Sequence, residues 1–270
     1  MGNRIVLSVM VPERCARDSM NSMKEVRGQT DGIGGERVAF FGGSFDPPHL
    51  GHLAVARAAR AALKLDTVLF APVGAQPLKP EGSSASFDDR VAMTRLAIAG
   101  EAGFEISLAD APRAGGGPNY TLETLRRVNE ELPVGSELFC LMGADSFFGL
   151  RSWHRAAEIP FAAPLIVASR PGLRPDEWLA GLRSALPAGL ALEAAPGLAD
   201  VETGVELKGY LVSNEAGESA PLYLLPGLYV EISASEIREQ IRDASDDPAA
   251  GQEPMPRAVL EAIRAGGLYR

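Results

Sequence analysis

Residues 40–53 read Phe-Phe-Gly-Gly-Ser-Phe-Asp-Pro-Pro-His-Leu-Gly-His-Leu, and this stretch decides the fold. An apolar segment passes through two glycines and two prolines into a long helical pattern of Ala and Leu. A strand, a Gly-rich turn and a helix N-terminus make an anion site, because free backbone N–H groups and the helix dipole both point at the turn. His49 and His52 lie three residues apart in the first helical turn and would face the same way. The stretch therefore predicts chemistry on a phosphate group.

This turn differs from the two common nucleotide-binding loops. It has no Gly-Lys-Ser/Thr sequence, so a lysine that cradles a γ-phosphate is not expected, and it lacks the glycine spacing of the dinucleotide fingerprint, which excludes a redox dehydrogenase. Two imidazoles take the place of the lysine, and their N–H donors can stabilise charge on a phosphate during displacement. The alternative is that His49 and His52 only cap the turn or pack on the helix. Two histidines at i and i+3 after Gly-Gly and Asp-Pro-Pro favour the phosphate site.

Around this stretch, apolar strands alternate with helical patterns along the chain. We expect strands at 38–41, 67–72, 104–108, 137–142, 164–169 and 221–225, weaker ones at 190–194 and 209–213, and helices at 48–64, 88–99, 121–132, 174–186, 235–244 and 256–265. This order predicts an α/β fold: a Rossmann-like, doubly wound parallel sheet with helices on both faces and the C-terminal helices packed on the core. In such sheets ligands bind beyond the carboxyl ends of the strands at the switch point, where residues 40–53 would sit.

The chain is expected to hold one folded domain, at 37–270. Residues 1–36 lack sustained periodicity and are interpreted as a poorly ordered N-terminal extension. Residues 173–220 carry a weak pattern and are treated as an uncertain insertion within the domain.

Composition excludes several classes of protein. The formal net charge of -9 argues against broad binding of nucleic acid or of an anionic membrane. Cys15 and Cys140 are too few for a disulfide framework or a metal knuckle, which fits a reducing cytoplasm. No apolar run approaches the ~20 residues that span a bilayer. The short run at 5–11 is followed by Pro-Glu-Arg and does not resemble a signal peptide.

Two motifs carry a resemblance to a known superfamily. Residues 42–52 resemble the Gly-x-Phe-Asp-Pro-x-His-x-Gly-His signature of the nucleotidyltransferases, and Ile-Ser-Ala-Ser-Glu-Ile-Arg at 232–238 resembles their second signature, Ile-Ser-x-Ser/Thr-x-Ile-Arg. Further resemblance, to bacterial nicotinate-nucleotide adenylyltransferases, lies in the stretches 118–121, 143–146, 165–172 and 267–270 and in Trp153, eight residues after Asp145. The resemblance covers 38–172 and 221–270.

The resemblance implies an activity and an ATP site. Members of this family join nicotinate mononucleotide to the AMP part of ATP in NAD biosynthesis, giving deamido-NAD and pyrophosphate. By position, the catalytic residues would be His49, His52 and Arg238. The implied ATP-binding residues are Gly42, Gly43, Ser44, Phe45, His49, His52, Ile232, Ser233, Ser235 and Arg238. Ser235 lies near the start of a helix, where its hydroxyl can also act as an N-cap, and Arg238 one turn on supplies a fixed-charge fork for phosphate.

The resemblance also implies a site for the pyridine nucleotide, with three departures from the family pattern. The residues assigned to it are Ser44, Phe45, Lys79, Thr121, Asp145, Trp153 and His154. The indole of Trp153 offers a stacking face for a pyridinium ring, although it can equally be a half-buried core aromatic. His154 stands where Tyr is common. In the segment that usually reads Pro-Pro-His-Lys, Gln76 and Leu78 replace the first Pro and the His, and Lys79 either neutralises phosphate or is simply solvated.

These residues predict direct in-line displacement at the α-phosphorus of ATP by a phosphate oxygen of nicotinate mononucleotide. Mg²⁺ is expected to travel with ATP, since the sequence shows no carboxylate cage and no metal site. The expected partners are ATP and nicotinate mononucleotide, without nucleic acid or membrane. The alternatives are another adenylyltransferase of the superfamily, with nicotinamide mononucleotide or phosphopantetheine as acceptor, and a non-catalytic nucleotide-binding regulator. The sequence leaves the oligomeric state and the strength of the acid-over-amide preference open.

Overall fold

The computed structural model describes residues 35–78, 81–169, 175–199, 205–226, 232–243 and 254–270. All of these belong to one compact unit that runs from Gly35 to Arg270. The extension expected at 1–36 lies outside the described residues apart from its last two positions, and so does Lys79.

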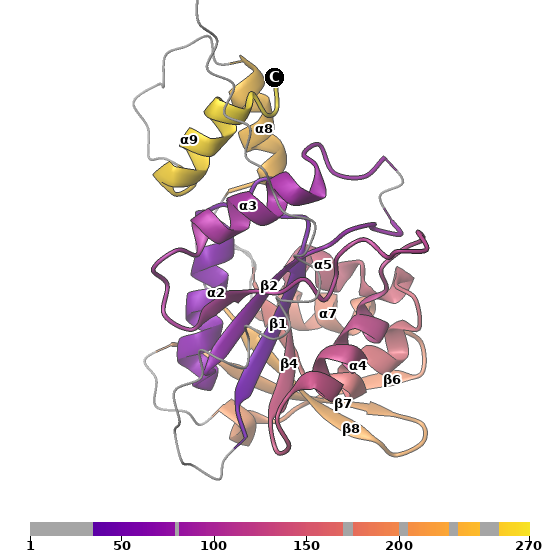
Figure 1. Ribbon diagram of the computed structural model, residues 1–270. Helices are drawn as coiled ribbons and strands as arrows, with labels where there is room; N and C mark the ends of the chain where they lie inside the picture. The colour runs from indigo at the N-terminus through magenta and orange to yellow at the C-terminus, as the bar shows by residue number, and fades with distance from the viewer. Residues whose placement is uncertain (1–34, 79–80, 170–174, 200–204, 227–231, 244–253) are drawn as a thin grey trace, which may run out of the picture. The chain divides into compact units, whose positions relative to one another are not determined.

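The described residues form one sheet of eight strands in the order β3-β2-β1-β4-β5-β8-β7-β6 (Figure 1). In chain order the strands are β1 (Arg37–Gly43), β2 (Thr67–Pro72), β3 (Phe104–Ile106), β4 (Glu137–Gly143), β5 (Leu165–Ala168), β6 (Leu190–Ala194), β7 (Lys208–Asn214) and β8 (Ser219–Leu225). The strands predicted in the weak stretch 173–220 are therefore present, and β6 has the predicted bounds.

The predicted doubly wound parallel sheet is confirmed, and it carries two further strands that are antiparallel at one edge. The pairs from β3 across to β8 are parallel, but β7 pairs antiparallel with both β8 and β6. The cause is the short connection after β7, where the Asn214 side-chain oxygen accepts N–H bonds from Ala216 and Glu218 and Gly217 has φ +83°. So tight a turn can only return the chain antiparallel to itself.

Helices cover both faces of the sheet, as predicted (Figure 1). They are α2 (Leu50–Leu63), α3 (Phe87–Ala97), α4 (Thr121–Glu131), α5 (Ala144–Phe148), α6 (Ile159–Ala162), α7 (Pro175–Ala185), α8 (Ala234–Asp243) and α9 (Arg257–Gly266), with single 3₁₀ turns η1 (Leu150–Ser152), η2 (Ala156–Glu158) and η3 (Pro196–Ala199). Among the described residues, no helix is both long enough and apolar enough to cross a membrane.

Apolar side chains gather in three clusters. One packs α4, α5, α6 and α7 on the sheet, and another packs α2 on its opposite face. In α2, Ala56, Ala59 and Leu63 are buried at helical spacing, and the small alanines let the helix lie close to the strands. The third cluster joins α8 and α9 to α3 through Met93, Ile237, Val259 and Ile263. The C-terminal helices therefore pack on α3, beside the end of the sheet where β1 stops.

The strand order places a switch point between β1 and β4. From β1 the chain moves outward to β2 and β3, then crosses back to β4 on the other side of β1. The carboxyl ends of β1 and β4, at Gly43 and Gly143, therefore flank the switch point, which is where ligands of such sheets bind.

Candidate active site

The turn after β1 is anchored by a buried phenyl ring. Phe45 has φ +47°, a conformation that a bulky residue adopts only when its surroundings enforce it. Its side chain is 1% exposed and lies 5.5 Å from the Phe41 ring and 5.6 Å from the Phe70 ring, measured between centroids. Burial of this ring holds the chain in the bend that leads into α2.

His49 and His52 lie together at the start of α2. Their ring centroids are 3.8 Å apart, and the His52 ring also packs against Phe45 at 4.9 Å. The backbone N–H of His49 donates to Nδ1 of His52 at 3.2 Å. Because Nδ1 of His52 accepts this bond, the proton of the neutral imidazole belongs on Nε2, which is then a donor.

Burial keeps both imidazoles neutral near pH 7. Burial lowers the pKa of His49 to about 4, and its Nδ1 atom is buried with no hydrogen-bond partner among the described residues. The pKa of His52 is also lowered, first by burial and then by repulsion from a charged His49. The pair can therefore offer N–H donors to an anion without carrying formal charge before the anion arrives.

At the start of α2, two backbone N–H groups that the sequence predicts to be free are already hydrogen-bonded. The Leu50 N–H donates to the carbonyl of Pro254 at 2.9 Å, and the His52 N–H donates to the His49 carbonyl at 3.0 Å. The prediction of free backbone N–H groups is wrong at these two positions, because neighbouring carbonyls already use them. The donor role at this turn thus falls on the imidazole side chains.

The structure brings the second signature against the first. Arg238, on α8, donates from Nη1 to the backbone carbonyl of Asp46 at 2.6 Å and from Nη2 to the Ser235 hydroxyl at 3.2 Å. Ser235 is the second residue of α8, and its own N–H donates to the Ser233 hydroxyl at 3.3 Å. The expected N-cap role thus belongs to Ser233. His49, His52, Ser235 and Arg238 form what we call the phosphate side of the site.

Asp46 is a site residue that the motif analysis did not single out. Its carboxylate is 4% exposed and accepts from the N–H groups of Ser84 at 2.6 Å and Ala85 at 3.1 Å. The Tyr269 hydroxyl also donates to Oδ1 of Asp46, at 2.7 Å. Two features of the sequence could have pointed to this contact. One is the aspartate inside the first signature, and the other is the tyrosine in the terminal stretch 267–270.

Arg90 is a second missed residue. Its side chain is 2% exposed, and its guanidinium donates to the carbonyls of Ser44 at 2.7 Å and Val73 at 2.8 Å. Burial lowers the pKa of Arg90 from its ordinary value, while the nearby Asp46 carboxylate opposes that shift. The contacts tie the turn after β1 to the loop after β2. No local pattern distinguishes this arginine from others on exposed helix faces.

The loop after β2 touches the first signature through a residue that departs from the family pattern. Gln76 donates from Nε2 to the Ser44 hydroxyl at 2.9 Å. Leu78, which stands in place of the expected histidine, is 58% exposed. Among the described residues of this loop, Gln76 thus contacts the first signature through its side chain.

Four of the seven residues predicted to bind the pyridine nucleotide come from the other side of the switch point. Thr121 begins α4, and Asp145 is the second residue of α5, directly after β4. The rings of Tyr120 and His154 stack at 4.2 Å, which places the Trp153-His154 segment beside the start of α4. Trp153 is partly buried against the core cluster under α4 and α5, so the alternative stated above, a half-buried core aromatic, describes its packing. We call Thr121, Asp145, Trp153 and His154 the acceptor side.

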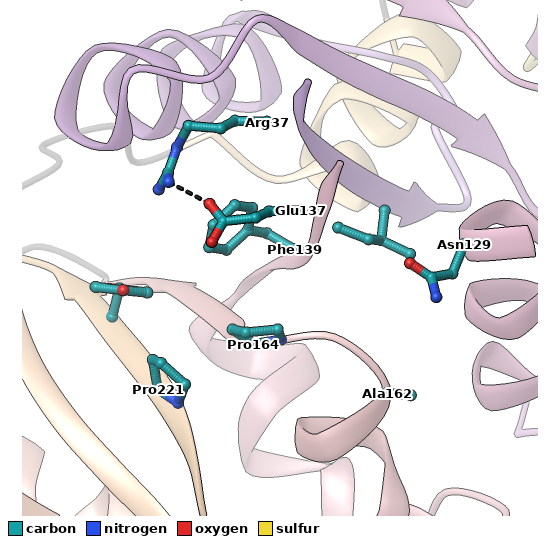
Figure 2. Close-up of a pocket in the computed structure, with 9 residues that line it drawn as sticks. Arg37, Asn129, Glu137, Phe139, Ala162, Pro164 and Pro221 are labelled. Carbon is teal, nitrogen blue, oxygen red and sulfur yellow. Dashed lines mark hydrogen bonds and ion pairs between the residues drawn. The ribbon is translucent and has the colours of Figure 1, made fainter. Parts of the chain in front are cut away.

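A cavity of about 270 Å³ lies elsewhere, at the opposite end of the sheet (Figure 2). Arg37 and Glu137, at the amino ends of β1 and β4, form an ion pair at its edge, and the Arg37 guanidinium lies 5.0 Å from the centre of the Phe139 ring. It contains none of the predicted site residues. Within the described part of the chain, no group of three or more His, Cys, Asp or Glu side chains is placed to hold a metal ion.

Comparisons with known proteins show the family to which the chain is related. Residues 40–240 match the family model described as cytidylyltransferase-like. A probable nicotinate-nucleotide adenylyltransferase of Gloeobacter violaceus is 48% identical over 87% of this chain and 97% of its own length. A protein of the same name from a Roseiflexus species is 35% identical over 86% of this chain and 98% of its own length.

Solved structures show the same fold. The nicotinic acid mononucleotide adenylyltransferase of Plasmodium falciparum complexed with NaAD superposes with a TM-score of 0.59 at 17% identity, over 87% of this chain and 97% of that one. The same Plasmodium enzyme complexed with APC gives a TM-score of 0.58 at 16% identity, with the same coverage.

Proposed function

The chain belongs to the nicotinate-nucleotide adenylyltransferase family of nucleotidyltransferases, and we propose that it transfers the AMP part of ATP to nicotinate mononucleotide, giving deamido-NAD and pyrophosphate in NAD biosynthesis. The observation that carries this proposal is the pair of neutral imidazoles after β1, together with Arg238 of the second signature, which is hydrogen-bonded to the Asp46 carbonyl in the same turn. The relatives' names support the acceptor. The position of the two histidines after β1, next to the switch point of the sheet, supports a nucleotide site there, because ligands of such sheets bind at that point.

The reaction is an in-line displacement at phosphorus. A phosphate oxygen of nicotinate mononucleotide attacks the α-phosphorus of ATP and forms a new P–O bond. The bond from the α-phosphorus to the oxygen that bridges to the β-phosphorus breaks, and pyrophosphate leaves with the electron pair. The attacking phosphate monoester is already an anion near pH 7, so the step needs no strong general base. Catalysis then rests on positioning and on stabilising the charge that develops.

His52 is assigned to the α-phosphate. Its Nε2 proton follows from the bond that Nδ1 accepts from the His49 N–H. A neutral donor held by packing against Phe45 needs little reorganisation as charge develops on the α-phosphoryl oxygens. His49 lies beside it and adds a second imidazole to the same group.

Arg238 and Ser235 are assigned to the β- and γ-phosphates, which leave as pyrophosphate. Their mutual hydrogen bond orients the guanidinium plane, and the Asp46 carbonyl fixes its other edge. Mg²⁺ is treated as part of the substrate Mg-ATP, held by phosphate oxygens and water.

The acceptor side is assigned to nicotinate mononucleotide. The exposed part of the Trp153 indole offers a face on which the pyridine ring stacks, and Thr121 lies at the start of α4 beside the Tyr120–His154 ring pair. Ser44 and Phe45, in the turn after β1, stay assigned to both nucleotides as a prediction. Lys79, in a position outside the described residues, stays assigned to phosphate neutralisation as a prediction. We further propose that 37–270 act as one domain and that the protein works in the cytoplasm.

An acceptor comparison tests this function. Purified protein is mixed with Mg-ATP and one of nicotinate mononucleotide, nicotinamide mononucleotide or phosphopantetheine, and pyrophosphate release is followed. We expect the highest kcat/KM with nicotinate mononucleotide. Faster release with either of the other acceptors contradicts the assigned substrate, and no release with any of them favours a non-catalytic regulator.

A further inference from the structure

The last residues of the chain return to the candidate site. Helix α9 ends at Gly267, which has φ +61°, and the Leu268 N–H donates to the Ile263 carbonyl at 3.0 Å. Tyr269 follows with φ +65°, in the left-handed region that a residue with a large side chain occupies only under constraint. The result is that the penultimate side chain points back to Asp46, with the two oxygens 2.7 Å apart.

Asp46 connects this tail to the phosphate side. Its Oδ1 accepts from Tyr269 and Ala85, and its Oδ2 accepts from Ser84. Arg238 donates to the carbonyl of the same residue at 2.6 Å, and its Nη1 lies 3.9 Å from Oδ2. Any shift of Asp46 therefore moves both the guanidinium of Arg238 and the turn that leads, through two prolines, to His49.

The apolar contacts of the tail do not by themselves require a hydroxyl. Leu268 and the Tyr269 ring pack on the cluster of Met93, Val259 and Ile263, and a phenyl ring would keep that contact. The hydroxyl donates to Asp46 at 2.7 Å and lies 3.9 Å from the sulfur of Met93, which is a weak acceptor. Burial and the bond to Asp46 both raise the pKa of Tyr269, so the group stays a protonated donor near pH 7.

We infer that Tyr269 is a positioning residue for adenylyl transfer, whose hydroxyl orients Asp46 and thereby aligns Arg238 on the phosphates of ATP. This inference rests on the proposed function. It gives the C-terminus a part in catalysis although Tyr269 itself touches no substrate. The tail would control the alignment of the phosphate side without contributing to the acceptor side.

The test compares Tyr269→Phe with a matched control, Tyr223→Phe. Tyr223 is a buried tyrosine, and it lines the cavity at the opposite end of the sheet. With saturating Mg-ATP and nicotinate mononucleotide, we expect kcat of Tyr269→Phe to fall about tenfold, which equals about 1.4 kcal/mol of transition-state stabilisation. The KM for nicotinate mononucleotide and the melting temperature should stay close to those of the wild type. Tyr223→Phe should keep wild-type kcat.

A double-variant cycle shows whether Tyr269 acts through Asp46. Asp46→Asn weakens the same hydrogen bond, so Tyr269→Phe should cause little further loss of kcat in the Asp46→Asn background. If the two substitutions lower kcat independently, so that their effects multiply in the double variant, the inference is contradicted. A Tyr269→Phe enzyme with a lower melting temperature but the wild-type turnover rate per active site also contradicts it. Unchanged turnover of Tyr269→Phe beside an active wild type overturns the inference alone. An inactive wild type contradicts the proposed function and this inference with it.

Discussion

The two sides of the candidate site are held in different ways. On the phosphate side, hydrogen bonds join residues from distant parts of the chain, as where Arg238 donates to the Asp46 carbonyl across 192 positions. On the acceptor side, the Tyr120 ring stacks on His154 and Trp153 packs on the core. Directional bonds fix the orientation of a group, whereas apolar packing chiefly excludes water and supplies surface.

This difference fits the two tasks proposed for the site, which are alignment of the reacting phosphates on one side and binding of the pyridine ring on the other. A displacement at phosphorus needs donors placed within tenths of an ångström of the developing charge, and such placement requires preformed bonds. A stacking surface for a flat ring tolerates small shifts, because the attraction varies slowly with lateral position. Changes on the phosphate side should therefore lower kcat, and changes on the acceptor side should raise the KM for the acceptor.

The largest effect is expected at His52. Removal of one donor from a preorganised anion site costs about 10²–10³ in rate, so His52→Ala should lose at least that much in kcat with its fold retained. Steady-state pyrophosphate release measures the loss. The control is His154→Ala, which removes the exposed histidine of the acceptor side and should change kcat by less than about fivefold, since one exposed contact is worth at most about 1 kcal/mol. Near-normal turnover of His52→Ala would contradict the assignment of the chemistry to the phosphate side.

The buried state of His49 predicts an acid-sensitive fold. Its pKa lies at about 4 in the folded protein and near 6.5 when exposed, so the unfolded chain binds more protons as the pH falls from 6.5. Stability is therefore greatest above pH 6.5 and is lost as the pH falls towards 4, by about 3 kcal/mol from this group alone. Urea unfolding at pH 7 and pH 4 should show a smaller pH-dependent loss for His49→Asn than for the wild type. Equal losses in the two proteins would show that His49 is not buried in its neutral form.

Trp153 tests the acceptor side. Trp153→Leu keeps apolar volume against the core but removes the indole face, so the KM for nicotinate mononucleotide should rise about tenfold while kcat changes little. The matched control is Phe148→Leu, which alters a part-exposed aromatic on the neighbouring α5 and should leave both constants unchanged. A loss confined to kcat in Trp153→Leu would place the indole in the chemistry and contradict the division between the two sides.

Replacement of Gln76 should give the smallest change in activity, because its side chain only supports Ser44 in the turn after β1. Gln76→Ala removes one neutral hydrogen bond to Ser44, worth about 1 kcal/mol, so kcat/KM should fall about fivefold. Leu78→Ala, in the same loop, replaces an exposed side chain and should have no effect. If the Leu78 variant loses more activity than the Gln76 variant, the loop acts through a contact other than the one to Ser44.

The local parts of this architecture were predictable from sequence. The strand at Thr67–Pro72 and the weak strand at Leu190–Ala194 have the predicted bounds, since a short apolar run between turn residues is a local signal. The position of His49 and His52 followed in the same way from a strand, a glycine turn and a helix start. The antiparallel edge was missed although Asn214 and Gly217 mark a tight turn.

The hydrogen bonds that the sequence did not predict join residues that are far apart in the chain. Asp46 and Tyr269 are 223 positions apart, and Arg90 binds carbonyls on two separate loops, so no periodicity reports either arrangement. The amide of Leu50 was predicted to be free because a helix start leaves its first N–H groups unpaired. A carbonyl from Pro254, at the far end of the chain, occupies it instead.

The most direct test of the two-sided site is a single-turnover experiment with ATP labelled at the α-phosphate. Excess enzyme is mixed with labelled Mg-ATP and saturating nicotinate mononucleotide, and the appearance of label in deamido-NAD is timed for the wild type, His52→Ala and Trp153→Leu. The rate should fall at least a hundredfold in His52→Ala and stay within about threefold of the wild type in Trp153→Leu. Wild-type transfer in His52→Ala, or equal losses in the two variants, would contradict the assignment of chemistry to the phosphate side.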